Sequence, residues 1–182
     1  MKVIDTPLND CVVLEPRVFG DERGFFLESW NAATFRDAGL AIDFVQDNHS
    51  RSAHGILRGL HYQTEQTQGK LVRVTQGDVF DVAVDLRESS SSFGQWFGLT
   101  LSAANHRMLW VPPGFAHGFY VTADSADFQY KCTELYHPQS EVCIAWNDPT
   151  LAIDWPLAAG DTPRLSEKDA QGLAFAEAPT FS

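Results

Sequence analysis

Cysteine, positive charge and long apolar runs are all scarce in this sequence of 182 residues. The three cysteines, Cys11, Cys132 and Cys143, are odd in number and form no Cys-x-x-Cys pair. This favours reduced thiols in a cytoplasmic protein over a disulfide framework or a zinc site. No apolar stretch approaches the ~18 residues that a transmembrane helix needs, and residues 1–7 lack the apolar core and cleavage site of a signal peptide. We therefore expect a cytoplasmic protein without a membrane partner.

Basic residues are outnumbered, since 13 Lys and Arg face 24 Asp and Glu, giving a formal net charge of −11. A phosphate backbone needs a basic footprint on the protein that binds it, so this balance argues against a nucleic-acid partner. It does not exclude a small phosphorylated ligand, because a local cluster of Arg and Lys can hold phosphate inside an acidic protein.

The composition is that of an ordinary globular protein, with 44% hydrophobic and 20% charged residues. The chain shows no internal repeat and no linker, and its one low-complexity tract is the run of four serines at 89–92. We expect residues 1–182 to form a single domain. Residues 165–182 are predicted to form a helical tail, in which Ser166 is the N-cap of a helix.

Short strands separated by turn signals dominate the chain up to about residue 147. The pattern predicts strands at 11–19, 25–30, 44–50, 78–86, 96–101, 108–111, 127–136 and 142–146, with turns at 20–24 and 112–119. One brief helix is predicted at 32–38, capped by Asn31 and ended by Gly39. Many short strands with one helix are typical of an all-β sandwich or barrel.

The stretch at 55–74 places polar side chains where a barrel strand would normally carry apolar ones. We expect one hairpin there, two strands joined by a polar loop, with Arg58 and His61 on the first strand and Lys70 on the second. Side chains alternate along a strand, so Arg58 and His61 line one pocket only if Gly59 marks a bulge or a bend. A base beside two cations indicates chemistry on an anionic substrate.

Each of these side chains also has an inert interpretation. His61 could be a hydrogen-bonded core histidine, although its neighbours favour a catalytic base. Lys70 could be a solvated strand end or, facing inward among valines, a cation that stabilises an enolate oxygen. The carboxylate that orients His61 could be Asp169 or Asp81, and sequence spacing does not choose between them. Because Ser166 precedes Asp169 with the spacing of a capping box, a helix cap is the default interpretation of Asp169.

Residues 112–117 resemble the second cupin motif, Pro-x-Gly-x-x-His. In metal-binding cupins this histidine joins a His-x-His-x(3,4)-Glu cluster. Here His61 is followed by Gln63 in place of the second histidine, although Glu65 lies near the right distance. The loss of a nitrogen ligand leaves the usual cage incomplete, so the motif indicates a cupin barrel and no metal. His117 could equally close the turn with a hydrogen bond.

Nine segments together resemble the dTDP-4-dehydrorhamnose 3,5-epimerase family, in family order and across nearly the whole chain. They are 19–28, Gln46-Asp-Asn48, Arg58-Gly-Leu-His-Tyr-Gln63, 69–73, 77–87, Pro113-Gly-Phe-Ala-His-Gly118, 130–131, 146–148 and Leu165-Ser-Glu-Lys-Asp169. The resemblance implies a double-stranded β-helix (a jelly-roll, cupin-like barrel) with short peripheral helices. It implies a homodimer that exchanges N-terminal strands, the substrate dTDP-4-keto-6-deoxy-D-glucose, and no metal or organic cofactor.

The resemblance also implies residue roles. His61 would be the general base, with Asp169 as its carboxylate partner. Tyr130 would be the acid that returns a proton from the opposite face, and Lys70 would stabilise the enolate. The implied substrate-binding residues are Phe19, Arg23, Phe26, Glu28, Gln46, Asn48, Arg58 and His117. Leu135 stands where family members often carry an aromatic residue that packs against the nucleotide.

The chemistry of such a substrate suits these side chains. A ketone at C4 acidifies the hydrogens at C3 and C5, because the resulting anion is delocalised as an enolate. A base that removes the proton, a cation that stabilises the enolate oxygen and an acid that returns a proton are then sufficient for the inversion. Arginine guanidinium groups match the oxygens of a diphosphate. Three alternatives remain: an enzyme that inverts only C5 or only C3, a metal-dependent cupin such as a dioxygenase or sugar isomerase, and a nucleotide-sugar binding barrel without catalysis.

Overall fold

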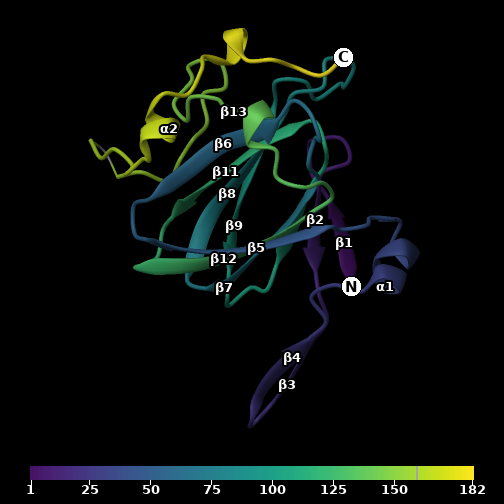
Figure 1. The fold of residues 1–182 in the computed structure, drawn as a ribbon. Helices are drawn as coiled ribbons and strands as arrows, with labels where there is room; N and C mark the ends of the chain where they lie inside the picture. Colours follow the sequence, from purple (N-terminus) through teal and green to yellow (C-terminus); the bar gives the residue numbers. More distant parts are fainter. Residues whose placement is uncertain (159) are drawn as a thin grey trace.

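The structure is a computed structural model that describes residues 1–158 and 160–182, and its main elements are antiparallel strands (Figure 1). The strands are β1 (Lys2–Asp5), β2 (Val12–Glu15), β3 (Val18–Asp21), β4 (Gly24–Leu27), β5 (Gln46–Ala53), β6 (Leu57–Gln63), β7 (Lys70–Gln76), β8 (Asp78–Asp85), β9 (Trp96–Ser102), β10 (Met108–Val111), β11 (Phe115–Val121), β12 (Ser125–Cys132) and β13 (Glu141–Cys143). The helices are α1 (Ala32–Asp37), α2 (Glu167–Ala170) and the short 3₁₀ turns η1 (Pro138–Ser140) and η2 (Phe175–Glu177).

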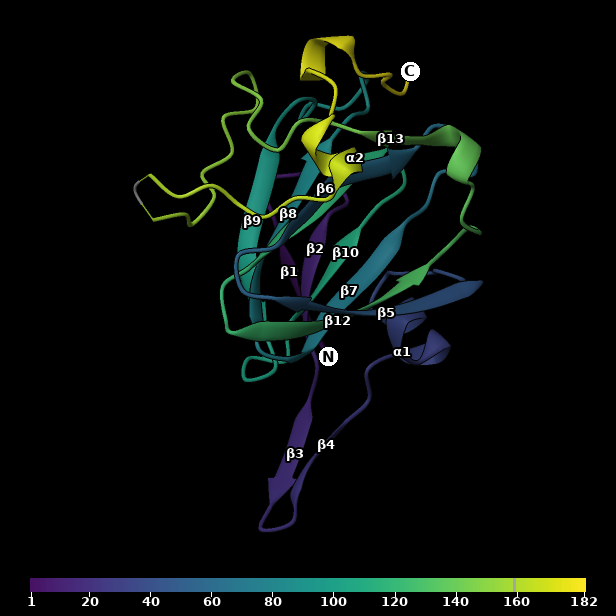
Figure 2. The same cartoon turned by 60° about the vertical axis from the view of Figure 1, so that its left-hand side comes forward.

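Two large sheets face each other. One has six strands in the order β1-β2-β10-β7-β12-β5, and the other has five in the order β13-β6-β11-β8-β9. Figure 2 shows the two layers, with β6, β8 and β9 in one and β7, β12 and β5 in the other. The chain passes repeatedly from one sheet to the other. This is the jelly-roll architecture, so the predicted fold class is confirmed.

Apolar side chains fill three layers. The layer between the sheets holds inward residues such as Val72, Val74 and Phe128. The outer face of the five-stranded sheet is covered by the C-terminal segment that follows β13, and the outer face of the six-stranded sheet by α1. Asn31 accepts hydrogen bonds from the first-turn amides of α1, as the sequence predicts for its N-cap. None of the described helices is long and apolar enough to cross a membrane.

The hairpin predicted over 55–74 is wrong, because its two strands belong to opposite sheets. β6 lies in the five-stranded sheet and β7 in the six-stranded sheet, and loop 64–69 carries the chain between them. The buried Gln63 anchors this crossing, since its amide donates to the carbonyls of Gln66 (2.8 Å) and Leu135 (3.2 Å). His61 and Lys70 therefore approach each other from opposite walls of the barrel.

Other predicted extents also differ from the structure. The strand expected at 127–136 is β12 and ends at Cys132, and β11 begins at Phe115, inside the turn expected at 112–119. The strand expected at 11–19 is divided into β2 and β3 at Pro16, which has no amide hydrogen to donate to a ladder. The tail expected to be helical over 165–182 contains only α2 and η2, although Ser166 does cap α2 by accepting from the amide of Asp169. The tail instead pairs with the five-stranded sheet through isolated bridges at Ile144 and Arg87.

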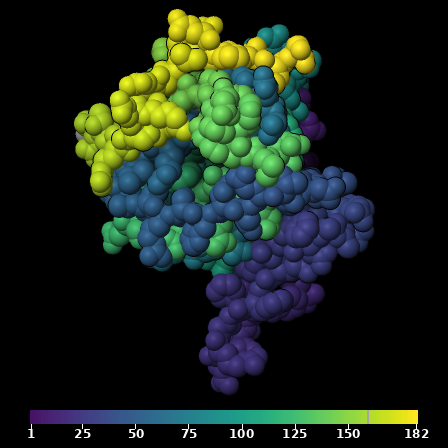
Figure 3. All heavy atoms as spheres, in the orientation of Figure 1, coloured from purple at the N-terminus to yellow at the C-terminus, as the bar shows by residue number. Residues whose placement is uncertain are grey.

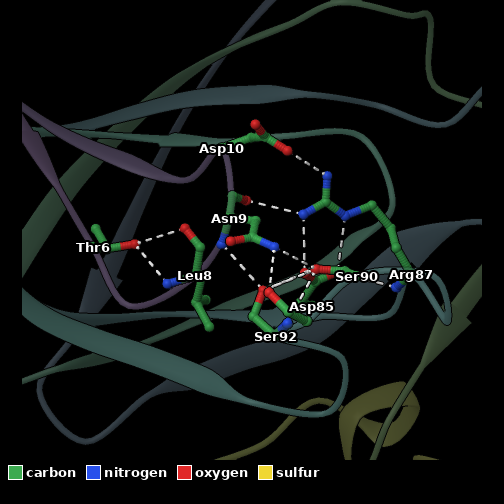
Figure 4. Close-up of polar contacts among 9 residues, drawn as sticks. Thr6, Leu8, Asn9, Asp10, Asp85, Arg87, Ser90 and Ser92 are labelled. Atoms are coloured by element: carbon green, nitrogen blue, oxygen red, sulfur yellow. Dashed lines mark hydrogen bonds and ion pairs between the residues drawn. The ribbon is translucent and has the colours of Figure 1, made fainter.

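The serine tract is a structural element and not a spacer. Figure 4 shows the carboxylate of Asp85, which is fully buried, accepting from Arg87 (2.9 Å), Ser90 (2.6 Å) and Ser92 (2.7 Å). Ser92 in turn accepts from the amide of Asn9, and Arg87 pairs with Asp10. This network fixes the connection between β1 and β2 to the end of β8.

Candidate active site

A cavity of about 650 Å³ opens between the two sheets where the C-terminal segment crosses their edge. It brings together eight of the twelve site residues that the sequence predicts. These eight are His61, Tyr130, Asp169, Lys70, Gln46, Asn48, Arg58 and His117. They come from β5, β6, β7, β11, β12 and α2, so the cavity depends on both sheets and on the tail.

A bulge in β6 lets Arg58 and His61 line the same cavity. β6 pairs with β11 so that His61 lies opposite His117 and Arg58 opposite Phe119, which leaves one extra residue on β6. Gly59 occupies the bulge with φ +128°, and a Cβ there would lie 2.5 Å from the Cα of Gly118. Only glycine fits this close approach, which confirms the bulge that the sequence predicts at Gly59.

His61 and Asp169 form a hydrogen-bonded pair at the cavity wall. His61 Nε2 lies 2.5 Å from Asp169 Oδ1, and the carboxylate also accepts from the hydroxyl of Ser166 (2.6 Å) and the amide of Gly59 (3.2 Å). The His61 side chain is 22% exposed and that of Asp169 is 3% exposed. Asp169 therefore bonds to the Ser166 N-cap, as the capping-box spacing predicts, and is also the partner of His61.

The protonation state of this pair suits a base. Burial lowers the pKa of His61 below its usual 6.5, although the hydrogen bond to Asp169 opposes that shift. Burial alone would raise the pKa of Asp169, but the hydrogen bonds from His61 and Ser166 outweigh it and hold that pKa well below its usual range. At neutral pH His61 is uncharged and Asp169 is a carboxylate.

A second histidine–carboxylate pair lies deeper in the same barrel. His117 Nε2 is 3.0 Å from both oxygens of Asp81, which comes from the neighbouring strand β8. The two side chains are 7% and 0% exposed. This geometry decides what the spacing could not, since Asp169 partners His61 and Asp81 partners His117.

Lys70 and Tyr130 face His61 from the six-stranded sheet. Lys70 Nζ donates to the backbone carbonyl of His61 at 3.4 Å, and burial lowers the pKa of this lysine. Burial raises the pKa of Tyr130, so its phenol keeps its proton at neutral pH. Beneath them, Phe128 lies within 6.0 Å of the Tyr130 and His117 rings. The cavity therefore places a neutral base on one wall and a proton donor on the other.

Three of the cations that line the cavity have no acidic partner in the described part of the chain. Within the described residues, neither Arg58, Lys70 nor Arg164 forms a salt bridge, although all three line the cavity. Arg58 Nε donates instead to the hydroxyl of Ser52 at 3.0 Å. Positive charge that the protein itself does not neutralise makes this cavity suited to an anionic ligand.

The cupin metal cage is replaced by structural contacts. Gln63, which stands at the second histidine position, uses both amide donors to hold loops and accepts from the amide of His137 (3.0 Å). Glu65 is exposed, and His117 is bound to Asp81. In the described chain the group with metal-binding spacing is instead His61, Cys143 and Asp169.

Several cavity residues were missed by the sequence analysis. Glu141 accepts from Tyr136 Oη (2.8 Å) and pairs with Lys168 (2.8 Å), and this bridge links the β12–β13 connection to α2 across the cavity mouth. Lys168 lies inside the segment 165–169 that carries the family resemblance, which was the available signal. Glu141 lies in no quoted segment and gives no such signal.

The remaining four predicted residues lie outside the cavity of this chain. Phe19, Arg23 and Phe26 are exposed on the β3–β4 hairpin, which projects from the body (Figures 1 and 3). Arg23 forms an ion pair with Asp21 in the same hairpin. Glu28 accepts hydrogen bonds from the start of α1. Exposed aromatic side chains on a projecting hairpin are typical of an interaction surface.

Comparisons with known proteins point to one family of nucleotide-sugar epimerases. The family model for dTDP-4-dehydrorhamnose 3,5-epimerase matches residues 5–177. The dTDP-4-dehydrorhamnose 3,5-epimerase of Pseudomonas aeruginosa is 60% identical over 182 residues, covering 100% of this chain and 99% of that protein. A Legionella pneumophila dTDP-6-deoxy-D-glucose-3,5-epimerase structure in complex with dTDP-4-keto-L-rhamnose has a TM-score of 0.93 and 54% identity, covering 97% of this chain and 93% of that one. A 3'-monoepimerase from Streptomyces bikiniensis in complex with dTDP-quinovose has a TM-score of 0.86 and 30% identity, covering 94% and 86%.

Proposed function

The chain belongs to the dTDP-4-dehydrorhamnose 3,5-epimerase family, and we propose that it inverts C3 and C5 of dTDP-4-keto-6-deoxy-D-glucose to give dTDP-4-keto-L-rhamnose. One observation carries the proposal: a neutral base, His61, and a protonated phenol, Tyr130, face one cavity from opposite sheets. Inversion at carbon requires removal of a proton from one face and its return to the other, and this arrangement supplies both groups.

The proton is removed by His61. Its Nε2 is engaged by Asp169, so Nδ1 accepts the proton from the carbon next to the ketone. The Asp169 carboxylate stabilises the imidazolium that forms. The electron pair of the C–H bond moves onto the C4 oxygen and gives an enolate, which Lys70 stabilises from the other wall.

Tyr130 returns a proton to the opposite face of the sugar. Its hydroxyl proton moves to the carbon, the enolate reverts to the ketone, and His61 and Tyr130 then exchange protons with water. Each turnover restores the oxidation state of the sugar, so the proposed reaction involves no redox cofactor. Arg58 and Arg164 would hold the diphosphate through their guanidinium forks.

The site is proposed to be completed by a second copy of the chain. The β3–β4 hairpin leaves its own body with Phe19, Phe25 and Phe26 50–69% exposed, which favours docking on another surface. Placed over a partner's cavity, Phe19, Arg23, Phe26 and Glu28 would close the sugar and diphosphate site. The proposed working unit is a cytoplasmic homodimer of single-domain chains.

Mixing two inactive dimers tests this exchange. One carries His61→Asn and the other carries Arg23→Ala. If the hairpin acts on the partner, each mixed dimer has one intact site, and activity recovers to about one quarter of the wild-type value after subunit exchange. If the hairpin acts within its own chain, no mixed dimer has an intact site and no activity returns. Unmixed samples that have passed through the same exchange are the controls.

Proton NMR of the substrate with enzyme in D₂O tests the reaction. Deuterium entering both C3 and C5, with formation of the L-rhamno product, is expected. The similarity to a 3'-monoepimerase makes inversion of one carbon the second candidate, and label at C3 or C5 alone would establish it. Binding of dTDP without any exchange would leave a non-catalytic barrel.

A further inference from the structure

A cysteine that the proposed reaction does not use lies behind the catalytic pair. Cys143 is on β13 directly opposite His61 on β6, and its Sγ is 3.9 Å from Asp169 Oδ1. Each of His61, Cys143 and Asp169 offers one ligand atom, and these three atoms lie within 4.8 Å of one another. Among the residues that the structure describes, no other three histidine, cysteine or acidic side chains have this spacing.

The three donors form a ligand set that zinc uses. Imidazole nitrogen, thiolate sulfur and carboxylate oxygen bind Zn²⁺ at ~2.0–2.3 Å, which sets neighbouring donors roughly 3.3–3.6 Å apart in a tetrahedron. To reach this spacing, His61 Nε2 and Asp169 Oδ1, now 2.5 Å apart, must move slightly further apart. The sulfur of Cys143 must move slightly closer to Asp169 Oδ1. The cation would replace the proton that His61 and Asp169 share.

Charge and burial also favour a divalent cation. Asp169 is buried and Cys143 is partly buried. A cation that displaces the thiol proton faces one thiolate and one carboxylate, and the resulting complex has no net charge. A neutral complex is the form that a site with little water accommodates at least cost.

A route to the cluster exists outside the substrate cavity. Cys143 lines a groove of about 480 Å³ between β13 and α2, together with Glu141, Glu167 and Lys168. The ammonium of Lys168 is paired with Glu141 at 2.8 Å, which reduces its repulsion of a cation. His61 and Asp169 line the substrate cavity, so the cluster forms the wall between the groove and the active site.

We propose that His61, Cys143 and Asp169 form a binding site for a thiophilic divalent cation such as Zn²⁺, and that occupancy switches the catalytic base off. A cation on Nε2 leaves the one proton of a neutral imidazole on Nδ1. That nitrogen must be free to accept the substrate proton, so His61 is converted from a base to a hydrogen-bond donor. The binding site stands on geometry alone, whereas the inhibition rests on the proposed epimerase function.

Equilibrium dialysis and Co²⁺ spectroscopy test the site without using catalysis. The intact protein is dialysed against Zn²⁺ and, separately, titrated with Co²⁺, whose thiolate complexes absorb in the near ultraviolet. We expect one Zn²⁺ per chain and a thiolate–Co²⁺ band, with Cys143→Ala binding at least about tenfold more weakly and showing no band. Cys11→Ala, a buried thiol that lines neither the cavity nor the groove, is the matched control and should retain both.

Kinetics with the same proteins test the consequence. Zn²⁺ should lower kcat while KM stays constant, EDTA should reverse the loss, and Mg²⁺, which prefers oxygen ligands, should have no effect. Each variant is compared with its own metal-free rate, and Cys143→Ser is a second variant should Cys143→Ala fold poorly. Equal Zn²⁺ binding by wild type and both Cys143 variants would overturn the site. Binding that requires Cys143 but leaves kcat unchanged would overturn the switch, and an enzyme inactive without metal would instead contradict the proposed function.

Discussion

Two histidine–carboxylate pairs lie in one barrel, and they differ in burial and in the origin of the carboxylate. We use these differences to assign one pair to catalysis and the other to a structural role. His61 is bound by Asp169 from the C-terminal tail, and its side chain is 22% exposed at the cavity wall. His117 is bound by Asp81 from the adjacent strand, and its side chain is only 7% exposed. The same two residue types, histidine and aspartate, therefore occur in two different environments of the barrel. Both histidines line the cavity, and we assign proton exchange with the substrate to His61, the more exposed of the two.

The two carboxylates also come from different kinds of element, a neighbouring strand for Asp81 and the C-terminal tail for Asp169. Asp81 lies on β8 within the same sheet as His117, so the register of two neighbouring strands fixes the pair. Asp169 lies 108 positions after His61 and reaches it only because the tail folds back over β6. The pair of His117 and Asp81 holds the His117 ring near Phe128, whereas the pair of His61 and Asp169 joins distant parts of the chain.

Replacing each histidine by asparagine should produce the largest difference in kinetics between the two pairs. His61→Asn removes the base, and we expect kcat to fall by about 10³-fold or more. His117→Asn keeps a polar group at the cavity, so we expect a loss of roughly tenfold that appears mainly in KM. Steady-state kinetics on both variants measures the difference. Equal losses in kcat would show that the two histidines share the chemistry.

Exchanging each carboxylate for its amide should separate catalysis from stability. Asp169→Asn removes the charge that stabilises the imidazolium, and we expect kcat to fall by roughly 10–100-fold. Asp81→Asn weakens a charge-assisted hydrogen bond at a fully buried site, which should cost about 1.5–3 kcal/mol in the free energy of unfolding. Urea denaturation and kinetics on both variants measure the two effects. The assignment fails if Asp81→Asn lowers kcat more than Asp169→Asn does.

The pH dependence should respond to one pair and not to the other. Because burial lowers the pKa of His61, kcat/KM of the wild type should stay constant down through pH 6.5 and fall only below it. Asp169 opposes that shift, so Asp169→Asn should move the acid limb to still lower pH. Asp81→Asn should leave the limb in place. An acid limb above pH 6.5 in the wild type would contradict a buried, neutral base.

Stability should fall in acid for the same reasons. His61 has a lowered pKa in the folded state, so its unfavourable contribution grows as pH drops below its usual 6.5, where the unfolded chain takes up the proton. Asp169 also has a lowered pKa, and it stabilises the fold above its usual 3.8 and loses that contribution as pH falls further. Thermal unfolding at pH 7, 5 and 2.5 should show both losses, and the second should be smaller in Asp169→Asn, because other carboxylates with lowered pKa values remain.

The sequence predicts local features better than it predicts which parts of the chain meet. The Gly59 bulge is predictable because alternation along a strand makes Arg58 and His61 incompatible without it. The alternation of side chains along a strand does not show which sheet the strand belongs to. The 55–74 segment was therefore expected to form a hairpin, although β6 and β7 lie in opposite sheets. A connection of six residues is compatible with either arrangement.

The choice between Asp81 and Asp169 shows the same limit. Spacing does not choose between the two aspartates, and the capping-box spacing that Asp169 satisfies gives no hint that its carboxylate also binds His61. Glu141 was missed because its role arises from the bridge it forms with Tyr136 and Lys168, which come from two different segments. Tertiary contacts of this kind depend on the folding back of the tail, which local patterns do not specify.

The most direct test of the account compares Tyr130→Phe with His61→Asn in D₂O. If the two residues act from opposite walls, Tyr130→Phe should still allow His61 to exchange the substrate hydrogens, so deuterium enters with retained configuration while inversion falls by about 10²-fold. His61→Asn should show neither exchange nor inversion. Loss of exchange and inversion in equal measure in Tyr130→Phe would contradict the division of roles between the two walls.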